Sequence, residues 1–194
     1  WIILNKNESV FVFFKKAATK IRFSHSVIPC FGLYEAKELK EGWNIQFDTK
    51  YGGPERAVKT DSLVSWTTTF ADTAIKFYSG TAVYSNRFEW NDKNMNRSVS
   101  LQIDSLYNIA TVKVNGIDCG TIWTHPYLVD ITKAIKPGVN TIEIEVTNTW
   151  HNRLIGDNLL PQNKRTTFTT APFRLDGKPL LPAGIVGKVK LILR

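Results

Sequence analysis

Residues 138–157 read GVNTIEIEVTNTWHNRLIGD, and this stretch decides the fold class. From Thr141 to Val146, polar and apolar side chains alternate with a period of two. That pattern is typical of a β-strand with one face buried and one face in water. The loop that follows carries a dense set of polar and aromatic side chains, namely Asn148, Trp150, His151, Asn152, Arg153 and Asp157.

The side chains of this loop indicate carbohydrate binding. An indole face stacks on the C–H face of a pyranose, so we predict Trp150 as a stacking platform. Asn152 and Asp157 are candidate partners for sugar hydroxyls. Arg153 is a candidate donor to a sugar oxygen or to an acidic sugar. Two alternatives stay open: the indole can plug the core at a sandwich edge, and the three polar side chains can bond internally to hold a long loop.

Most other elements that the sequence indicates are strands, because apolar residues recur with a period of two and are rich in Val, Ile, Thr, Tyr and Phe. Asn115-Gly116 between two such runs is the strongest short hairpin signal. Asp130 is expected to cap a short helical turn. The predicted fold class is all-β, a two-sheet antiparallel jelly-roll sandwich with one or two short helical turns. The predicted strands cover residues 9–14, 20–23, 43–48, 81–90, 97–103, 110–115, 117–122, 127–129, 141–146 and 185–193.

The sequence also predicts a division of the chain near Gly42, where a new alternating run begins at Trp43. We expect residues 1–42 to be the tail of a preceding domain plus a connector, and residues 43–194 to be the β-sandwich domain. The chain opens without an initiator Met, so we expect it to be excised from a longer protein. A long segment without a clear strand covers residues 150–184, and loops of that length tend to be functional.

Several motifs occur in the order of a known family. The runs VKVNG, CGTIWTHPYLVDITKAIKPGVNTIEIEVTN and AGIVGKVKL resemble the galactose-binding-like jelly roll that forms the sugar-binding domain of family 2 glycoside hydrolases. With FDTKYGGPE, LVSWT, IKFYSGTAVYSNRF and NTWHNRLIGD, the pattern over residues 43–194 is similar to the C-terminal region of the α-L-rhamnosidases of glycoside hydrolase family 106. The resemblance implies a secreted or periplasmic enzyme of polysaccharide breakdown whose catalytic barrel lies on another part of the chain. Trp123 and His125 of the WTHPY run join the candidate sugar contacts.

Composition weakens the other functional classes. The net charge of +8 arises at the two ends of the chain, while residues 43–150 hold ten basic and eleven acidic side chains, so we expect no nucleic-acid partner. No apolar run is long enough to span a membrane, so we expect no membrane partner. Cys30 and Cys119 lack a metal-ligand spacing and are expected as free thiols. We expect neither a cofactor nor a metal.

The sequence offers no persuasive catalytic pair. A glycosidase needs two carboxyl groups about 5 to 9.5 Å apart across the scissile bond. Glu143 and Glu145 share a strand face that alternation turns toward solvent. We therefore expect an ancillary carbohydrate-binding domain of a multidomain glycoside hydrolase, not catalytic by itself, with the missing catalytic domain as its partner. The alternative is a structural interdomain scaffold that packs on the catalytic barrel and binds no sugar.

Overall fold

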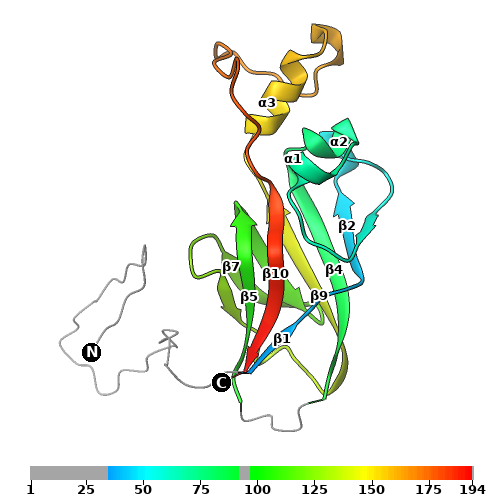
Figure 1. Cartoon of the computed structure of the whole chain (residues 1–194), viewed down its shortest axis with the longest axis vertical. Coiled ribbons are helices and arrows are strands. Elements are labelled where there is room, and N and C mark those ends of the chain that lie inside the picture. Colours follow the sequence, from blue (N-terminus) through cyan, green and yellow to red (C-terminus); the bar gives the residue numbers. More distant parts are fainter. Residues whose placement is uncertain (1–34, 92–96, 194) are drawn as a thin grey trace, which may run out of the picture.

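The computed structural model describes residues 35–91 and 97–193. Two antiparallel sheets face each other, and the helices gather at one end of them (Figure 1). The smaller sheet has the strand order β1-β10-β5-β8, and the larger has the order β3-β2-β4-β9-β6-β7. The predicted two-sheet sandwich is therefore confirmed. The elements are β1 (Glu35–Glu38), β2 (Trp43–Phe47), the 3-10 helix η1 (Thr49–Tyr51), β3 (Val58–Thr60), α1 (Trp66–Thr69), α2 (Thr73–Lys76), β4 (Thr81–Trp90), β5 (Val99–Tyr107), β6 (Ile109–Val114), β7 (Ile117–Ile122), β8 (Leu128–Asp130), β9 (Gly138–Thr147), α3 (His151–Asn158), the 3-10 helix η2 (Gln162–Lys164) and β10 (Gly184–Leu193).

The centre of the larger sheet is the β4–β9 pair, which stays in register along the full length of both strands. The alternation in β9 puts Ile142, Ile144 and Val146 into the core, each fully buried. The intervening glutamates point away from the core, as predicted. Glu145 accepts a 2.6 Å hydrogen bond from Lys113 of β6 on that outer face. Alternation thus fixes which face of the strand meets the opposite sheet.

An aromatic cluster fills the core beneath the helices. The indole of Trp66 stacks on Tyr84 and meets Phe47 and Tyr78 edge to face. Its Nε1 donates a 2.6 Å hydrogen bond to the hydroxyl of Tyr84, which also accepts the amide of Ile185 at 3.1 Å. Burial raises the pKa of Tyr84, so its hydroxyl stays neutral. These bonds tie α1, β4 and β10 together inside the core.

We expect Tyr84→Phe to lower the free energy of unfolding by about 1–3 kcal/mol, because two buried donors lose their acceptor. Urea unfolding followed by circular dichroism measures the change. The matched control is Tyr51→Phe, since Tyr51 is 46% exposed. Removing its hydroxyl should change the free energy of unfolding by no more than about 0.5 kcal/mol. Equal midpoints for the two variants would contradict the role given to the Tyr84 hydroxyl.

Two turns that the sequence predicts are present in the structure. At the β6–β7 hairpin, Asn115 and Gly116 both have positive φ, 52° and 77°, as a type I′ turn requires. Asp130 accepts the amide of Thr132 at 2.8 Å, which confirms the cap. The segment after Thr147 was predicted as irregular, and there the structure differs: α3 occupies residues 151–158.

Near the N-terminal side, β1 pairs with β10, from Glu35 opposite Leu193 to Glu38 opposite Lys190. The division of the chain at residue 42 stays a prediction. The strands expected at 9–14 and 20–23, together with Cys30, lie outside the described residues.

Cys119 is half-buried and free, and burial raises the pKa of its thiol.

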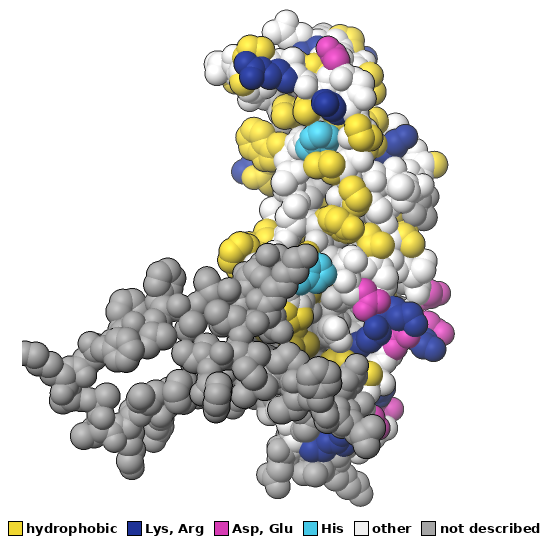
Figure 2. Space-filling model, turned by 60° about the vertical axis from the view of Figure 1, so that its left-hand side comes forward, with side chains coloured by type: hydrophobic (Ala, Val, Ile, Leu, Met, Phe, Trp, Pro, Cys, Tyr) yellow, Lys and Arg dark blue, Asp and Glu magenta, His cyan; other side chains and the backbone are white. Residues whose placement is uncertain are grey.

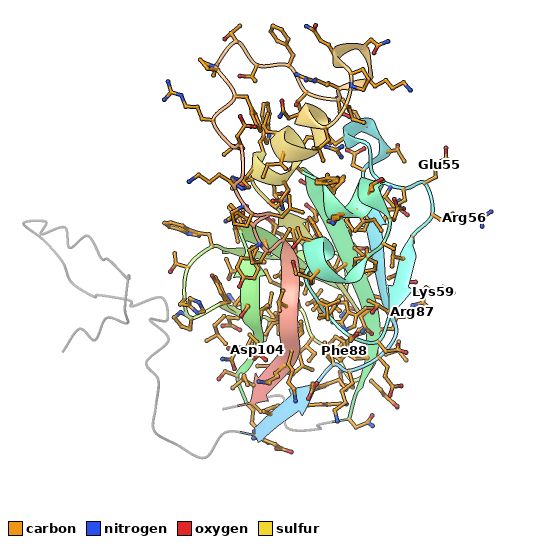
Figure 3. All side chains as sticks on the ribbon, turned by 45° about the horizontal axis from the view of Figure 1, so that its top comes forward. Glu55, Arg56, Lys59, Arg87, Phe88 and Asp104 are labelled. Atoms are coloured by element: carbon orange, nitrogen blue, oxygen red, sulfur yellow. The ribbon has the colours of Figure 1, made fainter. Side chains whose placement is uncertain are left out.

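Among the described residues, no helix has the length and apolar character needed to cross a membrane. Figure 3 labels Asp104 and Arg87 in the lower part of the sandwich. Asp104 of β5 accepts the backbone amide of Lys188 at 3.0 Å and the side chain of Lys190 at 2.9 Å. Partial burial acts to raise the pKa of Asp104, but the hydrogen bonds from Lys190 and Lys188 and their positive charges together lower it. Lys59 lies on β3, an edge strand of the larger sheet, and is exposed.

Candidate functional site

A pocket opens at the end of the sandwich where β9 leads into α3. Its volume is about 430 Å³, which falls in the range of small-ligand sites. Parts of the chain that are far apart in sequence meet there: η1, the beginning of β4, the end of β9, α3 and the segment after η2. We call it the Trp150 pocket. Its lining includes Tyr51, Thr81, Thr147, Trp150, Arg153 and Phe168.

Three aromatic rings stand at the rim of the Trp150 pocket. Trp150 immediately precedes α3 and is 62% exposed. Phe168 is 84% exposed and Tyr51 is 46% exposed. Because its indole is open to solvent, Trp150 does not plug the core, and that alternative is excluded. Exposed rings around a concave surface provide faces on which the apolar side of a sugar can stack.

The floor of the pocket is polar and held in place by hydrogen bonds. The hydroxyls of Thr81 and Thr147 lie 2.7 Å apart across the β4–β9 pair. Below the end of β9, Asn148 accepts the amide of Gly80 at 2.9 Å and donates to the carbonyl of Tyr78 at 2.9 Å. Asn148 is therefore a structural clamp that fixes the start of β4 under the pocket.

Arg153 reaches from α3 toward η1. Its Nη2 donates to the carbonyl of Tyr51 at 3.0 Å, and its backbone amide donates to the hydroxyl of Ser79 at 3.2 Å. Burial lowers the pKa of Arg153, and the charge of Asp157 opposes that change. The Nε of Arg153 is buried and has no hydrogen-bond partner. The side chain thus joins two walls of the pocket while part of its hydrogen-bonding capacity stays unused.

Asp157 and Asn152 bind the segment that follows α3. One oxygen of Asp157 accepts three bonds, from the amides of Thr166 and Thr167 and from the hydroxyl of Thr167, at 3.1, 2.7 and 2.6 Å. Its second oxygen lies 4.0 Å from Nη1 of Arg153. Asn152 exchanges two 2.8 Å bonds with the backbone of Leu181. Both side chains anchor the long segment that forms the outer wall, as the second alternative from the sequence described.

α3 sits on α2 through a close approach at Gly156. A Cβ at that position would lie 2.6 Å from both Cβ and Cγ of Phe77. We expect Gly156→Ala to lower the free energy of unfolding by about 1–3 kcal/mol, because the helix must shift away from Phe77. Thermal unfolding measures this, with Gly177→Ala as a control for the loss of a glycine, since nothing lies within 4 Å of that site. Gly177 has a φ of +66°, so its replacement carries only the backbone cost. A Gly156 variant as stable as the wild type would contradict tight packing at this contact.

Trp123 and His125 lie on the β7–β8 connection and do not line the Trp150 pocket. Trp123 is 70% exposed, and the ring of His125 packs on Tyr127 with 4.0 Å between centroids. The structure therefore brings together Trp150, Arg153 and, behind them, Asn152 and Asp157, but leaves the WTHPY pair on a separate surface.

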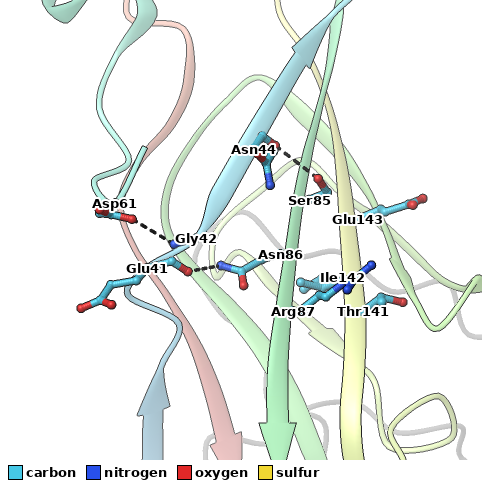
Figure 4. A pocket seen from close by; sticks show the side chains of 10 residues that line it. All are labelled: Glu41, Gly42, Asn44, Asp61, Ser85, Asn86, Arg87, Thr141, Ile142 and Glu143. Carbon is cyan, nitrogen blue, oxygen red and sulfur yellow. Dashed lines mark hydrogen bonds between the residues drawn. The ribbon is translucent and has the colours of Figure 1, made fainter. Parts of the chain in front are cut away.

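A larger hollow of about 860 Å³ lies on the outside of the larger sheet (Figure 4). Asn44, Ser85 and Arg87 contribute to it, and Glu143 borders it on β9. Its lining contains no aromatic ring. Without a stacking face, it is a weaker candidate for a sugar site than the Trp150 pocket, despite its greater volume.

In the described part of the chain, no group of three or more His, Cys, Asp or Glu side chains is arranged to hold a metal ion. The sequence reasoning missed Tyr51, Lys50 and Phe168 as pocket residues. Lys50 and Tyr51 belong to the FDTKYGGPE run, whose turn-rich composition marked a loop without indicating which other loop it meets. Phe168 lies in a polar run of threonines. The one signal that the sequence offered there was a single aromatic residue among polar neighbours.

The fold and sequence agree with known glycoside hydrolases. Residues 66–174 match the family model described as glycosyl hydrolase 2 galactose-binding domain-like. A rhamnosidase from Novosphingobium sp. PP1Y is similar in structure, with a TM-score of 0.77 and 36% identity, over 93% of this chain and 17% of that one. A curated protein from Formosa agariphila, named "Putative beta-glucuronidase", is 32% identical over an alignment of 174 residues, gaps included, that covers 77% of this chain and 15% of that protein.

A β-glucuronidase from Ruminococcus gnavus, solved in complex with D-glucuronic acid, shares the fold at a TM-score of 0.58 and 21% identity, over 82% of this chain and 29% of that one. The chain thus spans less than a third of the length of each of these proteins. The matched family model covers more than half of the chain, including β4 to β9, α3 and the pocket wall at 166–168. The chain therefore belongs to the glycosyl hydrolase 2 galactose-binding domain-like family.

Proposed function

We propose that this chain is an ancillary carbohydrate-binding domain of a larger glycoside hydrolase and that the Trp150 pocket holds the saccharide. The observation that carries the proposal is the exposed indole of Trp150 beside a polar floor of Thr81 and Thr147. The indole offers an apolar face, and the two hydroxyls can exchange hydrogen bonds with sugar hydroxyls. Arg153 adds a guanidinium at the wall.

The domain does not catalyse hydrolysis by itself under this proposal. Among the described residues, neither Asp nor Glu lines the Trp150 pocket, so a bound sugar meets no pair of carboxyl groups. Catalysis belongs to another domain of the parent protein, consistent with the short share of its relatives that this chain spans. We further propose that the parent is secreted or periplasmic, where polysaccharide substrates lie. Turnover of nitrophenyl rhamnosides, galactosides or glucuronides by this chain alone would overturn the non-catalytic role.

A titration of mono- and oligosaccharides, followed by tryptophan fluorescence, tests sugar binding. We expect saturable quenching by at least one sugar of the panel, because Trp150 is exposed at the pocket rim. Isothermal calorimetry with the same sugar provides an independent affinity. The absence of any response across a broad panel, by both methods, would sink the proposed binding role.

A second candidate is a structural scaffold between domains. The observation in its favour is a set of exposed apolar side chains outside the Trp150 pocket: Trp123, Ile117 and Val139 are 70%, 51% and 62% exposed. Such side chains can pack on a neighbouring domain of the parent enzyme. In that case the panel gives no quenching, and replacing Trp123 weakens association with the catalytic domain when the two are mixed.

A further inference from the structure

We infer that the Trp150 pocket selects an anionic saccharide, one that carries a uronate carboxylate or a sulfate ester, over its neutral counterpart. This inference rests on the proposed sugar-binding function. Two cationic side chains line the pocket, Lys50 from η1 and Arg153 from α3. In the described part of the chain no acidic side chain lines it. A ligand anion therefore enters a site of positive potential without a facing carboxylate.

The charge of Arg153 is only partly neutralised inside the protein. Its nearest acidic group, Oδ1 of Asp157, is 4.0 Å from Nη1, too long for a good hydrogen bond. The other oxygen of Asp157 is already used by Thr166 and Thr167. The Nε of Arg153 and the Oδ1 of Asp157 are both buried and both lack a hydrogen-bond partner, so the pair leaves donor capacity on the guanidinium unused. A buried guanidinium with unused donors gains from an additional negative charge nearby.

Lys50 supplies the second charge from the opposite wall. Its side chain is exposed, and Nζ lies 5.8 Å from the centroid of the Tyr51 ring. Among the described residues, Lys50 forms no ion pair with a carboxylate. An exposed ammonium at a rim acts mainly through screened attraction, so its effect should be moderate and sensitive to salt.

The chain segment next to the pocket is also positively charged. The segment 159–183 carries Lys164, Arg165, Arg174 and Lys178 against a single acidic residue, Asp176. Figure 2 shows Lys and Arg side chains across the top of the molecule, where this segment lies in Figure 1. Positive charge around a pocket mouth raises the local concentration of anions. The larger hollow differs, because three acidic residues, Glu41, Asp61 and Glu143, line it with one arginine.

Matched pairs of sugars test the inference directly: glucose with glucuronic acid, galactose with galacturonic acid, and glucose with its 6-sulfate. We expect the anionic member of each pair to bind about fivefold more tightly at low salt, and about 0.5 M NaCl to remove most of that difference. If both carboxylate and sulfate are favoured, charge alone selects the ligand. If only the carboxylate is favoured, the site reads a uronate.

The variant Lys50→Gln should lower the affinity for the anionic sugars about threefold and leave the neutral sugars unchanged. The matched control is Lys59→Gln, since Lys59 is likewise exposed but lies on β3, outside the lining of the pocket. Equal affinity for neutral and anionic sugars in the wild type would overturn the inference while the proposed sugar binding stands. The loss of all sugar binding is a different result, because it removes the proposed function as well.

Discussion

Replacing Asp157 with Asn is expected to lower the free energy of unfolding by about 2–4 kcal/mol, the largest stability change among the variants considered. The carboxylate is 3% exposed and one of its oxygens accepts three hydrogen bonds. An amide in its place can accept fewer bonds and turns an NH₂ group toward existing donors. It also leaves the guanidinium of Arg153 buried without a nearby negative charge.

The same change should loosen the outer wall of the Trp150 pocket, because Asp157 holds Thr166 and Thr167 against α3. Urea unfolding gives the stability, and amide hydrogen exchange over residues 159–183 reports the wall. Asp176→Asn is the matched control, since Asp176 is an exposed residue of the same segment. An Asp157 variant that unfolds at the wild-type midpoint, with unchanged exchange, would show that these bonds do not hold the wall.

Replacing Trp150 with Ala is expected to weaken saccharide binding by at least about tenfold, which corresponds to roughly 1.4 kcal/mol. The indole provides the largest aromatic face at the pocket rim, and its loss removes both stacking and the apolar area covered by the sugar. Stability should change little, because the side chain is 62% exposed and makes no capping bond to α3. Calorimetry with the tightest sugar of the panel measures the affinity.

Two further variants separate stacking from general loss of an indole. Trp150→Phe should retain part of the affinity, since a smaller aromatic face remains. Trp123→Ala should leave the affinity unchanged, because Trp123 is equally exposed but lies outside the pocket. If Trp123→Ala abolishes binding while Trp150→Ala does not, the saccharide binds at the β7–β8 connection instead.

Most strands of the described residues were predictable because each carries its own signal. The exceptions are β1 and β3, which were not predicted: β1 reads EAKE, with three charged residues, and β3 has three residues. In β9, polar and apolar side chains alternate from Thr141 to Val146, and the apolar ones are buried. In β4, every second residue is buried along the whole strand. α3 was missed because the side chains it buries are polar. By their spacing, the buried residues of α3 lie on one helical face: Asn152, Arg153, Gly156 and Asp157. A search for apolar residues at helical spacing does not detect such a face, because none of these residues is a large apolar one.

The candidate site was predictable only in part, for a similar reason. Trp150 and Arg153 come shortly after β9, so their loop could be recognised as a candidate binding segment. The opposite wall comes from η1, where the Tyr51 carbonyl meets Arg153 across 102 positions of sequence. No local pattern encodes which loops meet at the end of a sandwich, since the pairing of strands decides it.

The most direct measurement of the central claim, that the exposed indole and its pocket bind saccharide, is a two-dimensional ¹H–¹⁵N NMR titration with the best sugar of the panel. The chain has six tryptophans, and the indole N–H signal of Trp150 can be assigned from the Trp150→Phe variant. We predict saturable shifts of that signal and of the amides of Thr81 and Thr167, which line the pocket. Shifts that cluster instead around Ser85 and Arg87 of the larger hollow, or a spectrum that no sugar changes, would contradict the account.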